Sequence, residues 1–192
     1  MSSFSSLKNV HELGLFGEYE NKNENQIIKI KEIKNINLFQ AVKYKNSTEN
    51  FSSLKIDGLD LPSALKTSNN SSTRIIWMGP DNWYIFSSKE ISEDLNNFKE
   101  TDFALTDLSQ SRSIIELEGD MVLEVIKKGS PLDVGKLKVG NCANTVYNGI
   151  TITLDFISNN PNVIRIFGLR SFGESLYHSI TDASLEFGYK SI

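Results

Sequence analysis

Apolar residues that alternate with polar ones, or cluster with β-branched and aromatic neighbours, predict strands in both halves of the chain. Gly79-Pro80-Asp81 and Asn148-Gly149 have the residue types of tight turns, so each predicts a hairpin between the strands that flank it. The polar stretch 66–73 (KTSNNSST) predicts a loop. The expected strands are residues 27–33, 38–45, 74–78, 82–86, 103–108, 113–117, 142–147, 151–156 and 163–167.

Helical spacing of apolar residues predicts helices at 61–65, 91–98, 120–128 and 171–187. Ser92 and Asp120 are the expected N-caps of the second and third helices, and Gly129 is the expected left-handed residue after the third. Ser171 and Glu174 form a capping box for the last helix. This order of elements predicts the α+β class, with antiparallel sheets and helices packed on one side.

The 192-residue length fits one domain, which we expect at residues 26–192 after an N-terminal arm at 1–25. Leu13, Leu15 and Phe16 are the expected docking residues of that arm. The polar first residues lack the apolar core of a secretion signal, and no apolar run approaches the length of a membrane span. We therefore expect a soluble, cytoplasmic protein with no membrane partner.

Charge and cysteine content narrow the function classes further. A net charge of -4 and a pI near 5.3 argue against a nucleic-acid partner, because binding many phosphates needs a basic face. The single Cys142 rules out an internal disulfide and is expected to be a small buried residue.

No combination of residues indicates catalysis, a cofactor or a metal on this chain. The two histidines, His11 and His178, are far apart in the sequence, so neither a nucleophilic triad nor a zinc site is predicted. Glu116 and Glu118 share one face of a predicted strand, which we interpret as its solvent face. A phosphate-binding glycine loop of the required spacing is absent from the sequence.

Several polar and aromatic motifs have a distinctive residue pattern but contain no combination typical of catalysis. They are 77–83 (WMGPDNW), 106–112 (TDLSQSR), 128–133 (KGSPLD), 140–145 (GNCANT) and 170–172 (RSF). Their order and spacing resemble the gamma subunit family of heterotetrameric sarcosine oxidase. Two positions depart from the family's pattern: Asn82 stands for an acidic residue and Ser130 for a cysteine.

The resemblance implies a folate-binding aminomethyltransferase-like fold, that of the glycine-cleavage T-protein and of YgfZ-like proteins. It also implies a non-catalytic subunit of an enzyme that oxidatively demethylates sarcosine to glycine, an oxidoreductase acting on CH–NH groups. The products would be hydrogen peroxide and either formaldehyde or methylenetetrahydrofolate. FAD, FMN, NAD, tetrahydrofolate and zinc are expected on the alpha, beta and delta partner subunits.

Other functions stay open at this point. A stand-alone folate-binding aminomethyltransferase-like protein or regulator would use Asp107 to orient the folate amine. A YgfZ-like iron–sulfur maintenance factor would need a cysteine where Ser130 stands. For a subunit interface, the expected residues are Trp83, Arg112 and Arg170, because tryptophan and arginine dominate interface energetics. The alternative is that both tryptophans, Trp83 and Trp77, are core residues and that Arg112 forms an internal ion pair.

Overall fold

The computed structural model describes residues 5–47 and 54–192, and the chain divides into two compact units. The larger unit comprises the residues up to Lys34 and those from Ser111 to Ile192, and the smaller unit is Asn35–Gln110. This differs from the expected division into an arm at 1–25 and one domain at 26–192. The reason is pairing between distant segments, because residues 14–16 and 28–32 form strands that pair with the C-terminal half of the chain.

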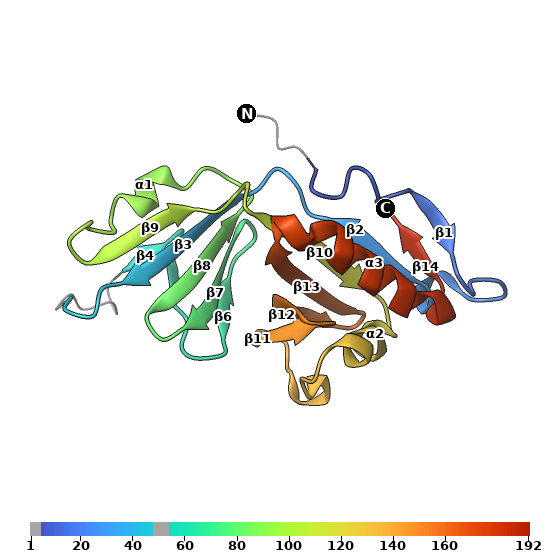
Figure 1. The fold of residues 1–192 in the computed structure, drawn as a ribbon. Helices are drawn as coiled ribbons and strands as arrows, with labels where there is room; N and C mark the ends of the chain where they lie inside the picture. The colour runs from blue at the N-terminus through green and yellow to red at the C-terminus, as the bar shows by residue number, and fades with distance from the viewer. Residues whose placement is uncertain (1–4, 48–53) are drawn as a thin grey trace. The chain divides into compact units, whose positions relative to one another are not determined.

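A seven-stranded sheet forms the larger unit. Its strands lie in the order β1-β14-β2-β10-β13-β12-β11, and every neighbouring pair is antiparallel except β14 with β2 (Figure 1). The strands are β1 (Gly14–Phe16), β2 (Ile28–Glu32), β10 (Arg112–Glu118), β11 (Cys142–Tyr147), β12 (Ile150–Asn159), β13 (Asn162–Leu169) and β14 (Tyr189–Ser191).

Helices α2 (Val122–Gly129) and α3 (Gly173–Ser184) pack on one face of this sheet. Val125 and Ile126 of α2 and Ile180 of α3 are fully buried in the same cluster as the inward residues of the strands. Short 3-10 turns lie at η1 (Glu24–Gln26), η3 (Val134–Lys136), η4 (Arg170–Phe172) and η5 (Leu185–Phe187). The expected α+β arrangement is therefore confirmed for the larger unit. Among the described residues, no helix is long and apolar enough to cross a membrane.

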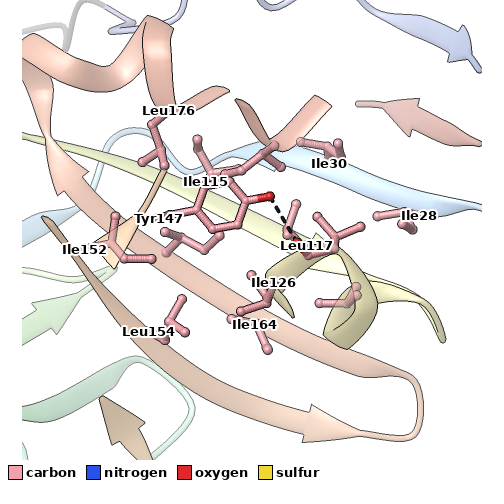
Figure 2. Close-up of a cluster of buried hydrophobic side chains, with 14 of the residues drawn as sticks. Ile28, Ile30, Ile115, Leu117, Ile126, Tyr147, Ile152, Leu154, Ile164 and Leu176 are labelled. Carbon is pink, nitrogen blue, oxygen red and sulfur yellow. Dashed lines mark hydrogen bonds between the residues drawn. The ribbon is translucent and has the colours of Figure 1, made fainter. Parts of the chain in front are cut away.

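Tyr147 lies at the centre of this core, surrounded by aliphatic side chains (Figure 2). Its side chain is fully buried, and its hydroxyl donates a hydrogen bond of 3.0 Å to the carbonyl oxygen of Val125. Burial, with a smaller contribution from the charge of Asp182, raises the pKa of Tyr147 to about 12. The hydroxyl therefore stays protonated and keeps its donor role at neutral pH.

The smaller unit is a five-stranded antiparallel sheet in the order β6-β7-β8-β3-β9, with a separate hairpin formed by β4 and β5. Ile75, Ile85 and Phe103 belong to its buried core. The elements are β3 (Asn37–Lys43), β4 (Lys55–Ile56), β5 (Leu59–Asp60), β6 (Thr67–Asn69), β7 (Thr73–Gly79), β8 (Asn82–Ser87), β9 (Phe103–Asp107) and the short helix α1 (Ser92–Leu95).

All nine predicted strands are confirmed within a few residues, and residues 5–47 and 54–192 contain five short strands beyond the prediction (β1, β4, β5, β6 and β14). The expected loop at 66–73 is wrong in part, because β6 pairs there with β7. Both predicted hairpin turns are present, with Asp81 and Asn148 at positive φ. Asp57 and Gly58 are also at positive φ between β4 and β5, where Asp-Gly is a hairpin signal in the sequence.

The predicted helix boundaries need correction. Residues 61–65 form no helix, and Leu65 has a left-handed φ of 61°. The N-cap of α1 is Ile91, because the Ser92 hydroxyl donates to Glu90 instead. The N-cap of α2 is Met121 rather than Asp120.

The expected capping box of the last helix is also wrong. The N-cap of α3 is Phe172, without a side-chain capping bond, because the η4 turn at Arg170–Phe172 leads directly into the helix. Glu174 instead accepts a hydrogen bond of 3.1 Å from the side-chain amide of Asn9. Phe172, predicted in the buried stripe, is 48% exposed.

The N-terminal segment docks mainly through Leu7 instead of the expected Leu13 and Leu15. Leu7 is fully buried in the core of the larger unit, whereas Leu13 is 74% exposed. Of the expected docking residues, Phe16 packs on the core and stacks on Tyr189 at a ring-centroid distance of 5.1 Å. Leu15 is 46% exposed.

Candidate functional site

Arg112 and Arg170, two of the three predicted interface residues, lie together at one end of the larger sheet. Arg112 begins β10 and pairs in register with Leu169, the last residue of β13. The backbone N–H of Arg170 donates to the carbonyl oxygen of Ser111 at 3.0 Å, and Nη1 of Arg112 donates to the same oxygen at 3.2 Å. One carbonyl group therefore holds both arginines at the same corner.

Exposed apolar side chains surround these arginines. Leu169 is 43% exposed and Phe172 is 48% exposed, whereas Arg112 and Arg170 are half-buried. We call the set Ser111, Arg112, Leu169, Arg170 and Phe172 the arginine corner. Guanidinium groups next to exposed aromatic and aliphatic side chains are typical of protein–protein interfaces, and they suit a partner surface that carries carboxylates.

A close packing contact positions the arginine corner. A β-carbon at Gly173 would lie 3.0 Å from Oγ of Ser113 and 3.5 Å from Cδ2 of Leu7. The lack of a side chain at Gly173 thus lets α3 begin directly against β10, with the arginine and phenylalanine of the RSF motif just before the contact. Oγ of Ser113 also accepts a hydrogen bond of 2.9 Å from Ser6.

Asp107 and Ser109, from the same motif as Arg112, stabilise a strand corner in the smaller unit. Oδ1 of Asp107 accepts the backbone N–H of Ser109 at 2.8 Å, and Oγ of Ser109 accepts the backbone N–H of Leu38 at 2.9 Å. These bonds fix the path of the chain where β9 ends. The carboxylate proposed to orient a folate amine therefore has a structural role in a turn.

Trp83, the third predicted interface residue, lies in the core of the smaller unit. It is 8% exposed, and its indole N–H donates to the carbonyl oxygen of Pro62 at 3.0 Å. Trp77 is partly buried against the same cluster. The alternative interpretation, a core tryptophan, therefore describes Trp83. Asn82, where the family has an acidic residue, accepts a hydrogen bond of 3.0 Å from Gln40.

The histidines and the cysteine are placed in different surroundings. Burial, and then the charge of Lys34, lower the pKa of His11, and its Nε2 is buried without a hydrogen-bond partner in the described structure. His178 is exposed on α3, and Cys142 is buried as expected. Across residues 5–47 and 54–192, no group of three or more potential ligands could hold a metal ion.

The carboxylates on β10 take part in cross-strand ion pairs. Oε2 of Glu116 accepts a hydrogen bond of 3.0 Å from Nε of Arg165 on β13. Oε1 of Glu118 lies 3.0 Å from Nζ of Lys29 on β2. Both pairs follow the register of the sheet, so the two glutamates serve strand pairing on one face.

Ser130 occupies the position at which the motif has a cysteine. It is 8% exposed, and its Oγ lies 3.1 Å from Oγ1 of Thr145, with either hydroxyl as the donor. Oγ of Ser130 also accepts the backbone N–H of Leu132 at 3.3 Å. The serine therefore connects the end of α2 to β11 and stabilises the turn that follows.

A buried carboxylate with no signal in the local sequence pattern anchors the N-terminal segment. Glu32 is 7% exposed and accepts hydrogen bonds from the Ser5 hydroxyl, the Ser6 backbone N–H at 2.9 Å and the Ser6 hydroxyl at 3.0 Å. Burial alone would raise the pKa of Glu32, but these bonds and the ammonium group of Lys34 outweigh it and lower the pKa. We call Ser5, Ser6, Leu7 and Glu32 the N-terminal latch.

Comparison with known protein families matches residues 50–186 to the sarcosine oxidase, gamma subunit family. Over 144 residues, the chain is 28% identical to sarcosine oxidase subunit gamma from Corynebacterium sp. (strain U-96). That alignment covers 68% of this chain and 66% of the relative, just under two thirds of its length.

Two solved structures have a similar fold. A chain of heterotetrameric sarcosine oxidase from Corynebacterium sp. U-96, in complex with pyrrole 2-carboxylate, superposes with a TM-score of 0.77 and 23% identity, covering 86% of this chain and 87% of that one. Glycine cleavage system aminomethyltransferase T from Bartonella henselae gives a TM-score of 0.60 at 10% identity, covering 80% of this chain and 45% of that one. The expected aminomethyltransferase-like fold is confirmed.

Proposed function

The chain belongs to the sarcosine oxidase gamma subunit family, and from that premise we propose that it is the non-catalytic gamma subunit of a heterotetrameric sarcosine oxidase. The observation that carries the proposal is the family match over residues 50–186, which includes all the motifs named above. In this chain those motif residues form turns, packing contacts and one exposed corner. These are the roles of a subunit that supports an assembly.

In the proposed complex, sarcosine is oxidatively demethylated to glycine while oxygen is reduced to hydrogen peroxide. The methyl carbon leaves as formaldehyde or is transferred to tetrahydrofolate as methylenetetrahydrofolate. FAD, FMN, NAD, tetrahydrofolate and zinc would belong to the alpha, beta and delta subunits, and the complex would act in the cytoplasm. Cofactors carry the difficult step of such reactions, so a subunit without a cofactor contributes through assembly.

The arginine corner is the surface through which we propose that the chain binds its partner subunits. Arg112 and Arg170 provide planar donors, and Leu169 and Phe172 provide exposed apolar area in the same place. Arginine and aromatic residues contribute most of the binding energy in many interfaces. Trp83 contributes to the fold of the smaller unit, because its indole ring is buried there.

Co-expression tests the proposal. A tag on this chain should recover a yellow complex that contains the alpha, beta and delta subunits and produces hydrogen peroxide from sarcosine. The isolated chain should be colourless and should give no peroxide. A tagged chain that elutes as a colourless monomer in the presence of all three partners would contradict the proposed function.

The aminomethyltransferase-like fold favours one second candidate, a stand-alone folate-binding protein or regulator. The match covers 45% of the aminomethyltransferase chain, so this chain corresponds to part of that fold. Titration calorimetry of the isolated chain with tetrahydrofolate decides between the two. Saturable heat from the isolated chain would support folate binding, and its absence would remove the second candidate.

A further inference from the structure

A groove at one edge of the larger sheet combines lysines with aliphatic side chains. It has a volume of about 310 Å³, and we call it the lysine groove. Three of its lining residues come from β1, β14 and β2, which lie side by side in the sheet (Figure 1). Its lining residues are Leu15, Lys22, Glu24, Ile27, Lys29 and Lys190.

The strand register places the groove on the face of the sheet turned away from the hydrophobic core. Leu15 on β1 pairs with Lys190 on β14, and Lys190 pairs with Lys29 on β2. Side chains at paired positions share a face, so these three form one row. The adjacent row, Phe16, Tyr189 and Ile28, packs into the core on the opposite face.

The groove has a local charge opposite to that of the whole chain. Three lysines and one glutamate line it, whereas the chain has a net charge of -4. Lys29 forms an ion pair with Glu118, and Nζ of Lys22 donates to the carbonyl oxygen of Glu186 at 3.2 Å. Lys190 is exposed and has no ion pair among the described residues. Its ammonium group is therefore available to pair with a carboxylate of another molecule.

Exposed aliphatic side chains continue beyond the groove along the same edge. Leu15 is 46% exposed, Leu13 is 74% exposed, and Ile27 is partly buried in the groove lining. β1 is the outermost strand, so one side of its backbone has no partner strand in the sheet that the structure describes. An exposed edge strand with apolar side chains beside it can pair with an extended segment of another chain.

We propose that the lysine groove docks an extended segment of a partner subunit, one that presents an aliphatic and an acidic side chain on the same face. The aliphatic side chain covers Leu15 and Ile27, and the carboxylate pairs with Lys190. Residues two apart in an extended chain share a face, so a short segment suffices. The identity of the partner as a subunit rests on the proposed function, whereas the chemistry of the segment rests on the groove.

Photo-crosslinking within the co-expressed complex tests the proposal. A photo-crosslinking amino acid replaces Leu15 in the full chain, and the crosslinked peptide is identified by mass spectrometry. The control position is Val139, which is 50% exposed in the loop before β11. We expect position 15 to crosslink to one segment that contains Asp or Glu two residues from an aliphatic residue. A complex that forms normally without such a crosslink would overturn the groove proposal and leave the proposed function intact.

Charge reversal provides a second measurement. Lys190→Glu should weaken association with the partner subunits about tenfold, because it places a carboxylate against a carboxylate. Lys138→Glu makes the same change in charge at an exposed residue outside the groove and should have no such effect. Equal loss in both variants, or no loss in either, would contradict the proposal. Wild-type binding to phosphatidylserine vesicles that Lys190→Glu abolishes would assign the groove to lipid and overturn it as well.

Discussion

The aromatic ring of Tyr147 occupies the space that a side chain at position 129 would need. A β-carbon at Gly129 would lie 2.6 Å from Cζ of Tyr147 and 2.7 Å from both Cε atoms. Gly129 ends α2 without a positive φ, so its expected role as a left-handed terminating residue is wrong. The glycine in the KGSPLD motif allows a tyrosine hydroxyl to reach the helix carbonyl of Val125.

Gly129→Ala should destabilise the larger unit by about 1–3 kcal/mol, because the ring or the helix must move to admit the methyl group. Replacing glycine by alanine within a helix usually raises stability, so the change expected here has the opposite sign. Gly135→Ala is the matched control, since its nearest neighbour would be Oδ1 of Asp133 at 3.4 Å. Urea unfolding measures both variants. Equal stability of Gly129→Ala and wild type would contradict the packing argument.

Tyr147→Phe should cost about 1 kcal/mol of unfolding free energy through loss of one buried hydrogen bond. The wild-type pKa of about 12 lies above the ordinary value for tyrosine, so the folded state favours the neutral hydroxyl. The neutral hydroxyl therefore contributes its full share of the unfolding free energy below about pH 10, and this contribution is lost as the pH rises through about 12. The difference between wild-type and variant ultraviolet titrations isolates this one tyrosine. A difference curve with its midpoint near pH 10 would show that Tyr147 is not buried.

Glu32→Gln should loosen the N-terminal latch, because the carboxylate accepts hydrogen bonds from Ser5 and Ser6. Bonds to a charged acceptor contribute about 1.5–3 kcal/mol. We expect faster hydrogen exchange at the backbone amides of Ser6 and Leu7. Glu12→Gln, at an exposed position, is the control.

Acid should reproduce the effect of Glu32→Gln. The pKa of Glu32 is lowered in the folded chain. The carboxylate therefore contributes its full stabilisation above the ordinary pKa of glutamate, about 4.3. The contribution is lost as the pH falls through the folded value. The stability difference between wild type and Glu32→Gln should therefore shrink below about pH 4. A difference that stays constant down to the acid transition would contradict the role of the carboxylate charge.

Asp57→Asn tests the anchoring of the β4–β5 hairpin. Hydrogen bonds from Lys89, then from Asn70 and from Thr73 and Ser72, lower the pKa of Asp57 well below its usual range. Asparagine tolerates the φ of 52° at this position, so the substitution removes charge without new backbone strain. The melting temperature should fall more than in Asp60→Asn. The ion pair of Asp60 with Lys55 is exposed and contributes little. Equal melting temperatures of the two variants would be inconsistent with anchoring by Asp57.

Arg170→Ala and Arg112→Ala should weaken assembly with the partner subunits while the isolated chain keeps its circular dichroism spectrum. Removal of a hot-spot arginine costs about 2 kcal/mol or more, roughly thirtyfold in affinity. Lys136→Ala removes a cation whose ion pair with Asp133 is exposed, and it should leave assembly unchanged. Loss of the fold in Arg112→Ala would instead support an internal structural role for that residue.

Strands with local turn signals could be predicted from the sequence, and elements formed by distant pairing could not. The hairpin at Asn148-Gly149 depends on residues that adopt positive φ, and this property is visible in the residue types. β14 has three residues, and its strand identity comes from β1 and β2 on either side. Whether such a short segment forms a strand depends on pairing with distant strands, and the residues of the segment itself do not indicate that pairing.

In the candidate site, too, features that depend on contacts between distant residues could not be predicted from the sequence. The RSF motif predicts Arg170 as an interface residue, but the exposure of Phe172 beside it follows from a 3-10 turn that replaces the first turn of the expected helix. That turn depends on the contact of Gly173 with Ser113, which is 60 positions earlier in the chain. Trp83 shows the opposite outcome: tryptophan is important in interfaces and in cores alike, so its residue type could not show that Trp83 is buried.

The position of β14 between β1 and β2 also determines the order in which the chain can fold as it is synthesised. The smaller unit is one continuous stretch, Asn35–Gln110, and all its strand partners are available once that stretch has left the ribosome. β1 and β2 are made first in the larger sheet, but the strand that joins them is made last. The edges of β1 and β2 that face β14 therefore stay unpaired until β14 has been made, and we expect the larger unit to fold more slowly and to be more prone to aggregation than the smaller one.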